Sequence, residues 1–275
     1  MSDPPVLAAD GVHVAYGSRE ALTDLNLEIT RGTVTALVGP NGSGKSTLLR
    51  ALGRLLKTTR GTVLLDGEAI ARLPTREVAR RLAMLPQGPS APGGLTVVEL
   101  VEQGRYPHAG PLRMLRRQDH DAITEAMSLT GMTAFANRAI DSLSGGERQR
   151  AWIALTLAQS APVLVLDEPT TFLDIRYQLE VLELVQSLNR RQGLTVAMAV
   201  HDLQHAARYA DRIVALCDGR IVADGPPPAV LTTKLLETVF GVHASILIDP
   251  VTGAPVAIPH AIVGTQGQRD LPGSS

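Results

Sequence analysis

The sequence predicts an α/β fold with a mostly parallel β-sheet, an N-terminal antiparallel β subdomain and an inserted helical subdomain. Two continuous apolar runs, Val163–Leu166 and Leu194–Val200, have the length and composition of buried parallel strands. Between them, apolar residues recur at helical spacing from Tyr177 to Arg190. This strand–helix–strand order implies parallel strands joined by right-handed crossovers.

The N-terminal part of the chain alternates apolar and polar residues with a period of two. The segments Val12–Tyr16 and Leu25–Ile29 show this alternation, with turn residues at Gly17-Ser18 and Arg31-Gly32. A further segment, Thr62–Gly67, has the composition of a strand that ends in an Asp-Gly turn. We therefore expect antiparallel strands in this region.

The segment Thr33–Val38 has the apolar character of a buried strand and leads into GPNGSGKST, Gly39 to Thr47, before the helical pattern of Leu48–Leu52. The nine residues fit G-x-x-x-x-G-K-[ST]. Glycines let backbone N–H groups point at phosphate oxygens, and the helix start adds the positive end of its dipole. In such a loop Lys45 reaches the β- and γ-phosphates and Ser46 binds Mg²⁺. The core is therefore predicted to be a P-loop NTPase, rather than a fold whose glycine-rich turn binds nothing.

Past the core strands, the remaining chain divides by composition. From about residue 90 to 140, helical spacing is broken by proline and glycine, which predicts the helical subdomain, joined to the core through Leu85–Gly88. The whole nucleotide-binding domain is predicted to span residues 6–240. A β-like C-terminal extension is expected over residues 241–265, and the tail 266–275 is expected to be disordered.

The end of the core and the extension contain three shorter elements. The segments Arg212–Leu216 and Arg220–Ala223 flank an Asp-Gly pair and predict a hairpin. Helical spacing follows near Leu231–Phe240. Beyond it, Ile246–Pro259 is rich in proline and glycine and predicts a hairpin or an extended strap.

Composition excludes several classes of protein. With 44% hydrophobic and 19% charged residues the chain is typical of globular proteins. A net charge of −1 offers no electrostatic reason to expect a nucleic-acid partner. No run of 18 apolar residues is present, and the first residues lack the pattern of a secretory signal. Together with the single cysteine, Cys217, these features predict a cytoplasmic protein.

Polar side chains stand at the carboxyl ends of three predicted strands, where open α/β sheets bind ligands. Beside the phosphate loop, Asp167 could hold Mg²⁺ and Glu168 could orient or deprotonate a water. His201 could donate a hydrogen bond to a γ-phosphate oxygen, and Gln87 could offer an oxygen to Mg²⁺. Taken alone, Asp167-Glu168 could instead be a helix cap and His201 a structural residue.

The segment LSGGERQR, Leu143 to Arg150, predicts a second helix start that binds an anion. Ser144 and Glu147 form a capping box. Each of two glycines in a first helical turn costs about 1 kcal/mol relative to alanine, so their presence needs another reason. A close approach of backbone N–H groups to a phosphate is such a reason.

In this order and spacing, GPNGSGKST, Gln87, LSGGERQR, VLVLDEP (Val163–Pro169), Asp174 and His201 resemble the nucleotide-binding subunit of an ATP-binding cassette (ABC) transporter. The resemblance covers nearly the whole chain. It implies an ATPase that forms a head-to-tail homodimer, with ATP held between the phosphate loop of one copy and Ser144-Gly145-Gly146 of the other.

The resemblance also implies a role for each matching residue. Glu168 and His201 are expected to be catalytic, and Asp174 to link the two sites of the dimer. The ATP-binding residues expected within one chain are Tyr16, which stacks on adenine, Gly39, Pro40, Asn41, Gly42, Ser43, Gly44, Lys45, Ser46, Thr47 and Gln87. Those expected to act across the dimer are Ser144, Gly145, Gly146 and Glu147, and those around Mg²⁺ are Ser46, Gln87 and Asp167.

A narrower resemblance is to the ATPase subunits of importers for iron–siderophore complexes, haem or cobalamin. It rests on Gly104–His108, on Thr170–Ile175, on His201–Ile213 and on the proline-rich tail. It implies polytopic membrane permease subunits as partners, indirectly a solute-binding protein, and a location on the inner face of the cell membrane. Cargo would not touch this subunit.

The sequence disfavours two other functional classes. A soluble ABC-type ATPase that acts on nucleic acid or the ribosome is disfavoured by the single cassette and the near-neutral charge. A GTP-dependent switch is disfavoured because no N-K-x-D motif is present. We therefore expect ATP and Mg²⁺ as cofactors and no nucleic acid as partner.

Overall fold

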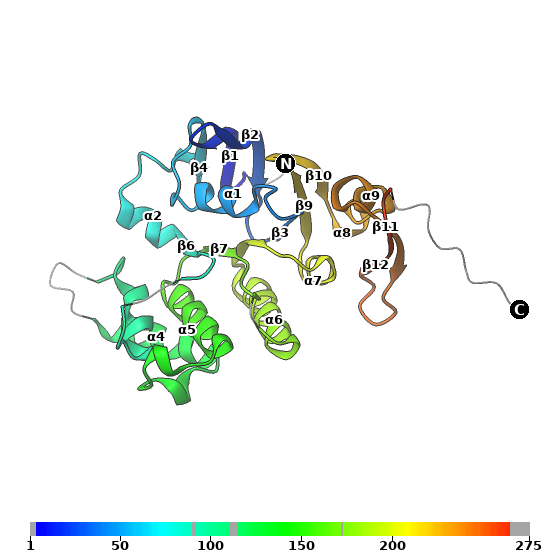
Figure 1. The fold of residues 1–275 in the computed structure, drawn as a ribbon. Coiled ribbons are helices and arrows are strands. Elements are labelled where there is room, and N and C mark those ends of the chain that lie inside the picture. The colour runs from blue at the N-terminus through cyan, green and yellow to red at the C-terminus, as the bar shows by residue number, and fades with distance from the viewer. Residues whose placement is uncertain (1–3, 90–91, 110–114, 172, 265–275) are drawn as a thin grey trace, which may run out of the picture.

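The computed structural model describes residues 4–89, 92–109, 115–171 and 173–264, and its N-terminal strands form an antiparallel sheet (Figure 1). The strand order is β2-β1-β4-β5. The strands are β1 (Leu7–Tyr16), β2 (Arg19–Ile29), β4 (Arg60–Leu65) and β5 (Glu68–Ala69). The expected Asp-Gly turn joins β4 to β5, where a positive φ at both Asp66 and Gly67 turns the chain tightly. The predicted antiparallel strands are thus present.

The central sheet has the order β10-β9-β3-β8-β7-β6. All of its strands are parallel except β10, which pairs antiparallel with β9. The strands are β3 (Val34–Val38), β6 (Leu82–Leu85), β7 (Val163–Asp167), β8 (Thr195–Ala199), β9 (Arg212–Cys217) and β10 (Arg220–Gly225). Both faces of this sheet are covered, which explains the continuous apolar runs in the sequence.

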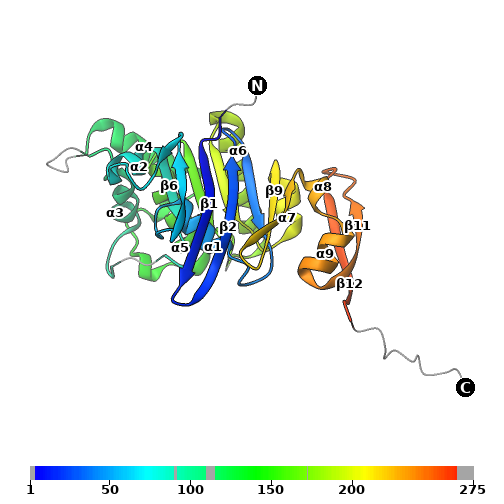
Figure 2. The same ribbon diagram turned by 90° about the horizontal axis from the view of Figure 1, so that it is seen from above.

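The side chains of β7 show how the two faces are filled. Val163 and Val165 pack into an apolar cluster that includes the N-terminal sheet and α1 (Lys45–Leu52). Leu164 and Leu166 pack into the cluster on the opposite face, which includes α6 (Ile175–Gln192). Figure 2, seen from above, shows β1 and β2 in front of the central strands with α6 behind them. Because β3, β7 and β8 run parallel, their carboxyl ends lie at the same edge of this sheet.

Among the described helices, α2 (Thr75–Arg81) and α7 (Leu203–Tyr209), each of seven residues, had no counterpart in the sequence prediction. The start of α7 does have a sequence signal, because Asp202 Oδ1 accepts hydrogen bonds from the N–H groups of Gln204 and His205. Both helices are too short to show a clear apolar period.

The expected helical segment has an apolar cluster of its own. Its elements are α3 (Val97–Glu102), η1 (Gln103–Arg105), α4 (Arg117–Leu129), η2 (Thr133–Phe135) and η3 (Ile140–Ser142). The cluster continues beyond residue 140 into α5 (Gly145–Ala158), through Ala151, Ala154 and Ala158. Figure 1 shows this lobe to one side of the central sheet, near β6. Residues 90–91 and 110–114 lie outside the described part of the lobe.

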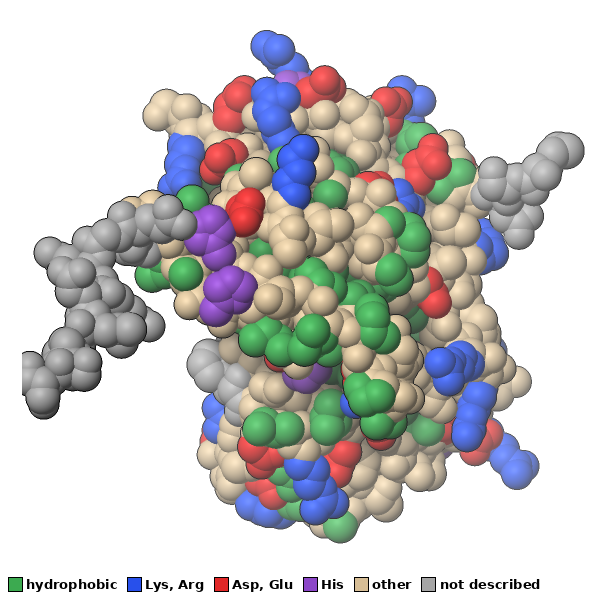
Figure 3. Space-filling view, turned by 90° about the vertical axis from the view of Figure 1, so that its right-hand side faces the viewer, with side chains coloured by type: hydrophobic (Ala, Val, Ile, Leu, Met, Phe, Trp, Pro, Cys, Tyr) green, Lys and Arg blue, Asp and Glu red, His purple; other side chains and the backbone are tan. Residues whose placement is uncertain are grey.

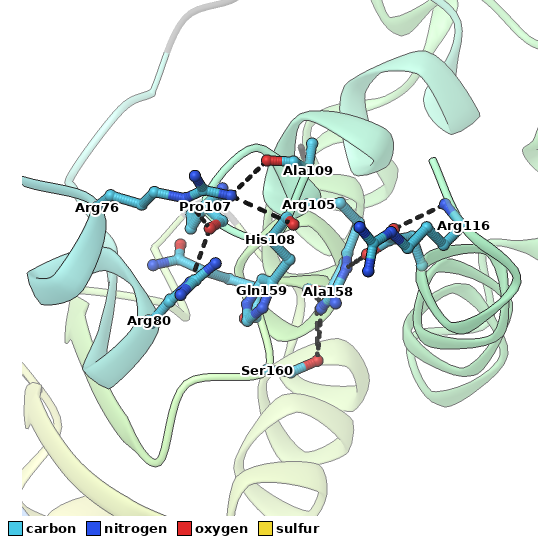
Figure 4. A network of polar contacts seen from close by, with 11 residues as sticks. Arg76, Arg80, Arg105, Pro107, His108, Ala109, Arg116, Ala158, Gln159 and Ser160 are labelled. Carbon is cyan, nitrogen blue, oxygen red and sulfur yellow. Dashed lines mark hydrogen bonds and ion pairs between the residues drawn. The ribbon is translucent and has the colours of Figure 1, made fainter. Parts of the chain in front are cut away.

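A polar network connects the lobe to α2 (Figure 4). Arg76 and Arg80 each donate through Nε to the carbonyl oxygen of Pro107 at 2.8 Å. His108 Nε2 lies 2.8 Å from the carbonyl oxygen of Gln159, whose side-chain amide donates to the carbonyl oxygen of Leu82 at 2.9 Å. The loop after η1 is therefore bonded to α2, to the end of α5 and, through Gln159, to the start of β6.

A helix pair precedes the C-terminal extension, and the extension itself is a β-hairpin. The elements are α8 (Pro227–Val230), α9 (Thr233–Phe240), β11 (Val242–Ile248) and β12 (Pro255–Ile262), and the two strands pair antiparallel. Figure 3 shows hydrophobic side chains gathered on the side of the molecule where this hairpin lies, and the exposed ones include Leu247, Ile248 and Val251. The predicted disordered tail, 266–275, lies outside the described residues. Within the described ranges, no helix is long and apolar enough to cross a membrane.

Candidate functional site

The loop between β3 and α1 needs glycine for both backbone geometry and space. Gly39, Gly42 and Gly44 have φ values of 146°, 80° and 104°. A Cβ at Gly39 would lie 2.2 Å from the carbonyl oxygen of Leu216 in β9. Any side chain there would push the loop off the sheet, so the glycine pattern reflects packing as well as ligand access.

Lys45 is buried at the start of α1 and points back along this loop. Its Nζ donates to the carbonyl oxygens of Gly39, at 2.7 Å, and Pro40, at 3.1 Å. Burial lowers the pKa of Lys45, while the nearby carboxylates of Glu168 and Asp167 act in the opposite direction. The ammonium group is thus held over the loop where a phosphate chain would lie.

Asp167, the last residue of β7, reaches the first turn of α1. Its Oδ1 accepts a hydrogen bond from Ser46 Oγ at 2.8 Å. Its Oδ2 is buried without a hydrogen-bond partner, and Arg50 Nε lies 3.8 Å away. Burial raises the pKa of Asp167 more than the Ser46 hydrogen bond lowers it. A buried, partly unsatisfied carboxylate of this kind favours a bound cation.

Glu168 lies in the middle of a polar cluster and has the left-handed backbone conformation, with φ 55°. His201 Nε2 lies 2.6 Å from its Oε1. Gln87 Nε2 donates to its Oε2 at 2.7 Å, and Thr171 Oγ1 donates to the same oxygen at 3.1 Å. Because β6, β7 and β8 are neighbours in the sheet, residues far apart in the sequence meet here.

A cavity of about 760 Å³ opens above this cluster and the phosphate loop. The predicted residues that line it are Tyr16, Asn41, Gly42, Ser43, Gly44, Lys45, Ser46, Thr47, Gln87, Glu168 and His201. Gly39, Pro40 and Asp167 lie behind this lining and contact it through Lys45 and Ser46. Tyr16 is half exposed at the end of β1, where its ring is open to a ligand. The volume fits a nucleotide.

Sequence analysis missed several residues of the cavity wall. Arg19, Glu20 and Ala21 come from the start of β2, and Asp218 and Gly219 from the β9–β10 turn. No sequence motif marks these residues. They come to the cavity because β2 and β9 pair with their neighbouring strands in the folded chain. Their one sequence signal was the Asp-Gly pair, which indicates a turn and no ligand.

The four residues expected to act across a dimer do not line this cavity. Ser144 caps α5 by accepting from the N–H of Glu147 at 3.3 Å, and Glu147 Oε2 accepts from the N–H of Ser144 at 2.8 Å. Nothing lies within 4 Å of a Cβ placed at Gly145, whereas one at Gly146 would contact Leu173 at 3.4 Å. The exposed helix start therefore has free space in front of it within one chain.

Asp174 begins α6, and a glutamine of α5 contacts the turn that follows Glu168. Asp174 Oδ1 caps α6 by accepting from the N–H of Tyr177 at 3.1 Å. Gln149 Nε2 donates to the carbonyl oxygen of Pro169 at 3.0 Å. Helix α5 thus contacts the turn that follows Glu168 directly. The sequence analysis assigns no role to Gln149. Phe172, in the loop between Glu168 and Asp174, lies outside the described residues.

Comparison with known proteins agrees with this geometry. The profile of the family described as ABC transporter matches residues 22–171. The chain belongs to the ABC transporter family. It is an ATP-binding subunit and an ATPase of the ABC cassette fold, as the sequence predicted.

Similar proteins extend over nearly the whole chain. The probable siderophore transport system ATP-binding protein YusV of Bacillus subtilis (strain 168) is 49% identical, over 92% of each chain. The ferric enterobactin transport ATP-binding protein FepC of Escherichia coli (strain K12) is 47% identical, over 92% of this chain and 93% of its own. The dimeric ATP-binding cassette MJ0796, in a post-hydrolysis state bound to ADP and Pi, is 30% identical with a TM-score of 0.72, over 80% and 98% of the two chains.

Proposed function

We propose that this ABC cassette hydrolyses ATP to power a membrane importer whose cargo is an iron–siderophore complex. The observation that carries the proposal is the cluster around Glu168 at the wall of a nucleotide-sized cavity. The choice of cargo follows the names of relatives 47–49% identical over more than nine-tenths of the chain. Haem and cobalamin are the other cargoes of the same importer group.

The residues beside the phosphate loop fit Mg²⁺ bound together with a nucleotide. Asp167 Oδ2 is a buried carboxylate oxygen without a hydrogen bond, and Ser46 Oγ already contacts the other oxygen. Within the described ranges, no group of three His, Cys, Asp or Glu side chains could hold a metal alone. Mg²⁺ takes few protein ligands and completes its shell with phosphates and water. We assign Ser46, Asp167 and Gln87 to this shell, and the ion would neutralise phosphate charge.

Each remaining side chain then has a defined task. Glu168 accepts a proton from, or orients, the water that attacks the γ-phosphate. His201 donates to a γ-phosphate oxygen, and Lys45 with the loop N–H groups stabilises the negative charge that develops there. Tyr16, open to the cavity, stacks on the adenine ring.

A head-to-tail homodimer would complete each site. Neither steric crowding nor a positive φ requires glycine at position 145, and Ser144 and Gly145 are exposed. Space for a close approach to another molecule is the reason we assign to Gly145. Ser144, Gly145, Gly146 and Glu147 would then contact the γ-phosphate bound by the partner, with Asp174 beside the junction.

The proposed partners are polytopic permease subunits and, through them, a solute-binding protein. The subunit would lie on the inner face of the cell membrane, where the helical lobe near Gln87 receives the permease. Purification from detergent-solubilised membranes, followed by mass spectrometry, tests this part. Recovery of a polytopic protein supports it, and recovery only with ribosomes or nucleic acid would contradict it.

The hydrolytic part is tested with the substitution Glu168→Gln, which keeps the shape of the side chain. We expect ATP turnover to fall at least a hundredfold while ATP binding remains. We also expect the variant to be a dimer in saturating MgATP by light scattering. A variant that retains turnover would refute the role of Glu168, and a monomer would refute the shared site.

A further inference from the structure

The carboxylate of Glu168 is bonded by three side chains that come from different parts of the fold. His201, beyond β8, contacts Oε1, whereas Gln87, beyond β6, and Thr171 both donate to Oε2. Both oxygens are therefore occupied by protein groups, and Glu168 is almost fully buried, with 8% of its surface exposed. A carboxylate held in this way has a defined orientation.

Two of the three donors have another task in the proposed function. Gln87 would face Mg²⁺ and His201 would face the γ-phosphate, and both line the cavity that the nucleotide enters. A His201 Nε2–H that donates to a γ-phosphate oxygen is drawn away from Glu168. Gln87 contacts Glu168 through its amide nitrogen and would bind Mg²⁺ through its amide oxygen, so we expect a turn toward the ion to weaken the contact with Glu168. If both side chains turn away, the Thr171 hydroxyl is the one of the three donors that still bonds the Glu168 carboxylate.

Thr171 differs from these two residues because it belongs to the same turn as Glu168. Its N–H donates to the carbonyl oxygen of Glu168 at 3.3 Å, and its Oγ1 donates to the carboxylate at 3.1 Å. It is not among the residues that line the cavity. The turn is also bonded from outside, by Gln149 to Pro169 and by Gln178 to Leu173 at 3.0 Å each. Because both contacts lie within one turn, we expect Thr171 to stay bonded to Glu168 when the other two side chains turn away.

We propose that Thr171 is a positioning residue, whose hydroxyl keeps the Glu168 carboxylate aimed at the attacking water after Gln87 and His201 have turned to the nucleotide. The assignment rests on the proposed function. It separates two sets of contacts: those that secure Glu168 before ATP binds, and the one that secures it during hydrolysis. A bond within one turn suits the second task, because it needs no movement between elements.

The test compares Thr171→Val, which removes the hydroxyl but keeps the shape, with Thr171→Ser, which keeps the hydroxyl. We expect Thr171→Val to lower kcat for ATP by about tenfold or more, because a hydrogen bond to a charged group is lost. KM for ATP and the Kd of a non-hydrolysable ATP analogue should stay within about twofold, and Thr171→Ser should restore most of kcat. A purely structural role would instead move Kd and thermal stability together with kcat.

Thr130→Val is the matched control, since Thr130 Oγ1 also makes a local hydrogen bond, to the carbonyl oxygen of Ala126 at 2.9 Å, but lies in the helical lobe. It should leave kcat unchanged. A Thr171→Val enzyme with wild-type kcat, or a Thr171→Ser enzyme as slow as Thr171→Val, would overturn the assignment and leave the proposed function standing. A wild-type chain without ATPase activity would overturn both.

Discussion

The buried ion pair between Arg105 and Asp119 should contribute strongly to the stability of the helical lobe. Arg105 Nε lies 2.9 Å from Asp119 Oδ1, and its Nη1 donates to the carbonyl oxygen of Ala158 at 2.6 Å and to Ser160 Oγ at 2.9 Å (Figure 4). Only 8% and 5% of the two side chains are exposed. Arg105→Met would leave the Asp119 charge buried, which costs about 3–5 kcal/mol. At about 2 °C per kcal/mol for a chain of this size, Tm should fall by roughly 6–10 °C.

The matched control is Arg176→Met, because Arg176 Nε also lies 2.9 Å from a carboxylate oxygen, that of Glu180, but with 82% of its side chain exposed. A surface pair of this kind contributes about 0–1 kcal/mol, so Tm should change by less than about 2 °C. Thermal unfolding followed by circular dichroism measures both variants. Equal Tm shifts in the two variants would refute the reasoning that burial, rather than distance, sets the strength of the pair.

Three further predictions follow from the network and from the cavity. Burial lowers the pKa of His108, and Arg105 and Arg80 lower it further, although the Gln159 carbonyl opposes this. The unfolded chain therefore takes up the proton first, so Tm should decline as pH falls through 6.5, and His108→Gln should flatten that decline. Tyr16→Ala should raise the Kd for ATP about fivefold or more but leave the Kd for tripolyphosphate unchanged. Tyr106→Ala, at a similarly exposed tyrosine, should change neither. A Cβ at Gly219 would lie 2.5 Å from the Ala21 carbonyl oxygen, so Gly219→Ala should weaken ATP binding severalfold, whereas Gly67→Ala, with free space, should not. Equal affinities in the two glycine variants would contradict the steric argument.

The residues that the structure brings together at the candidate site could be named from the sequence, because most of them belong to short motifs. The phosphate loop needs consecutive residues, and Asp167 and Glu168 directly follow an apolar run. The same reasoning missed α2 and the wall residues from β2, since a helix of seven residues or an exposed strand end carries no periodic signal. Gln149 was missed for a related reason. The group that it contacts is the backbone carbonyl oxygen of Pro169, which lies outside α5 and carries no side-chain signal.

The sequence by itself determined the strand–helix alternation of the core, the P-loop and the resemblance to ABC cassettes, because local patterns and motifs record backbone conformation and ligand type. Only the tertiary structure decided which side chains meet. Parallel pairing of β6, β7 and β8 brings Gln87, Glu168 and His201 together, and the left-handed turn at Glu168 brings Thr171 back to the same carboxylate. Contacts of this kind depend on strand register and on burial, which arise only when the sheet is assembled.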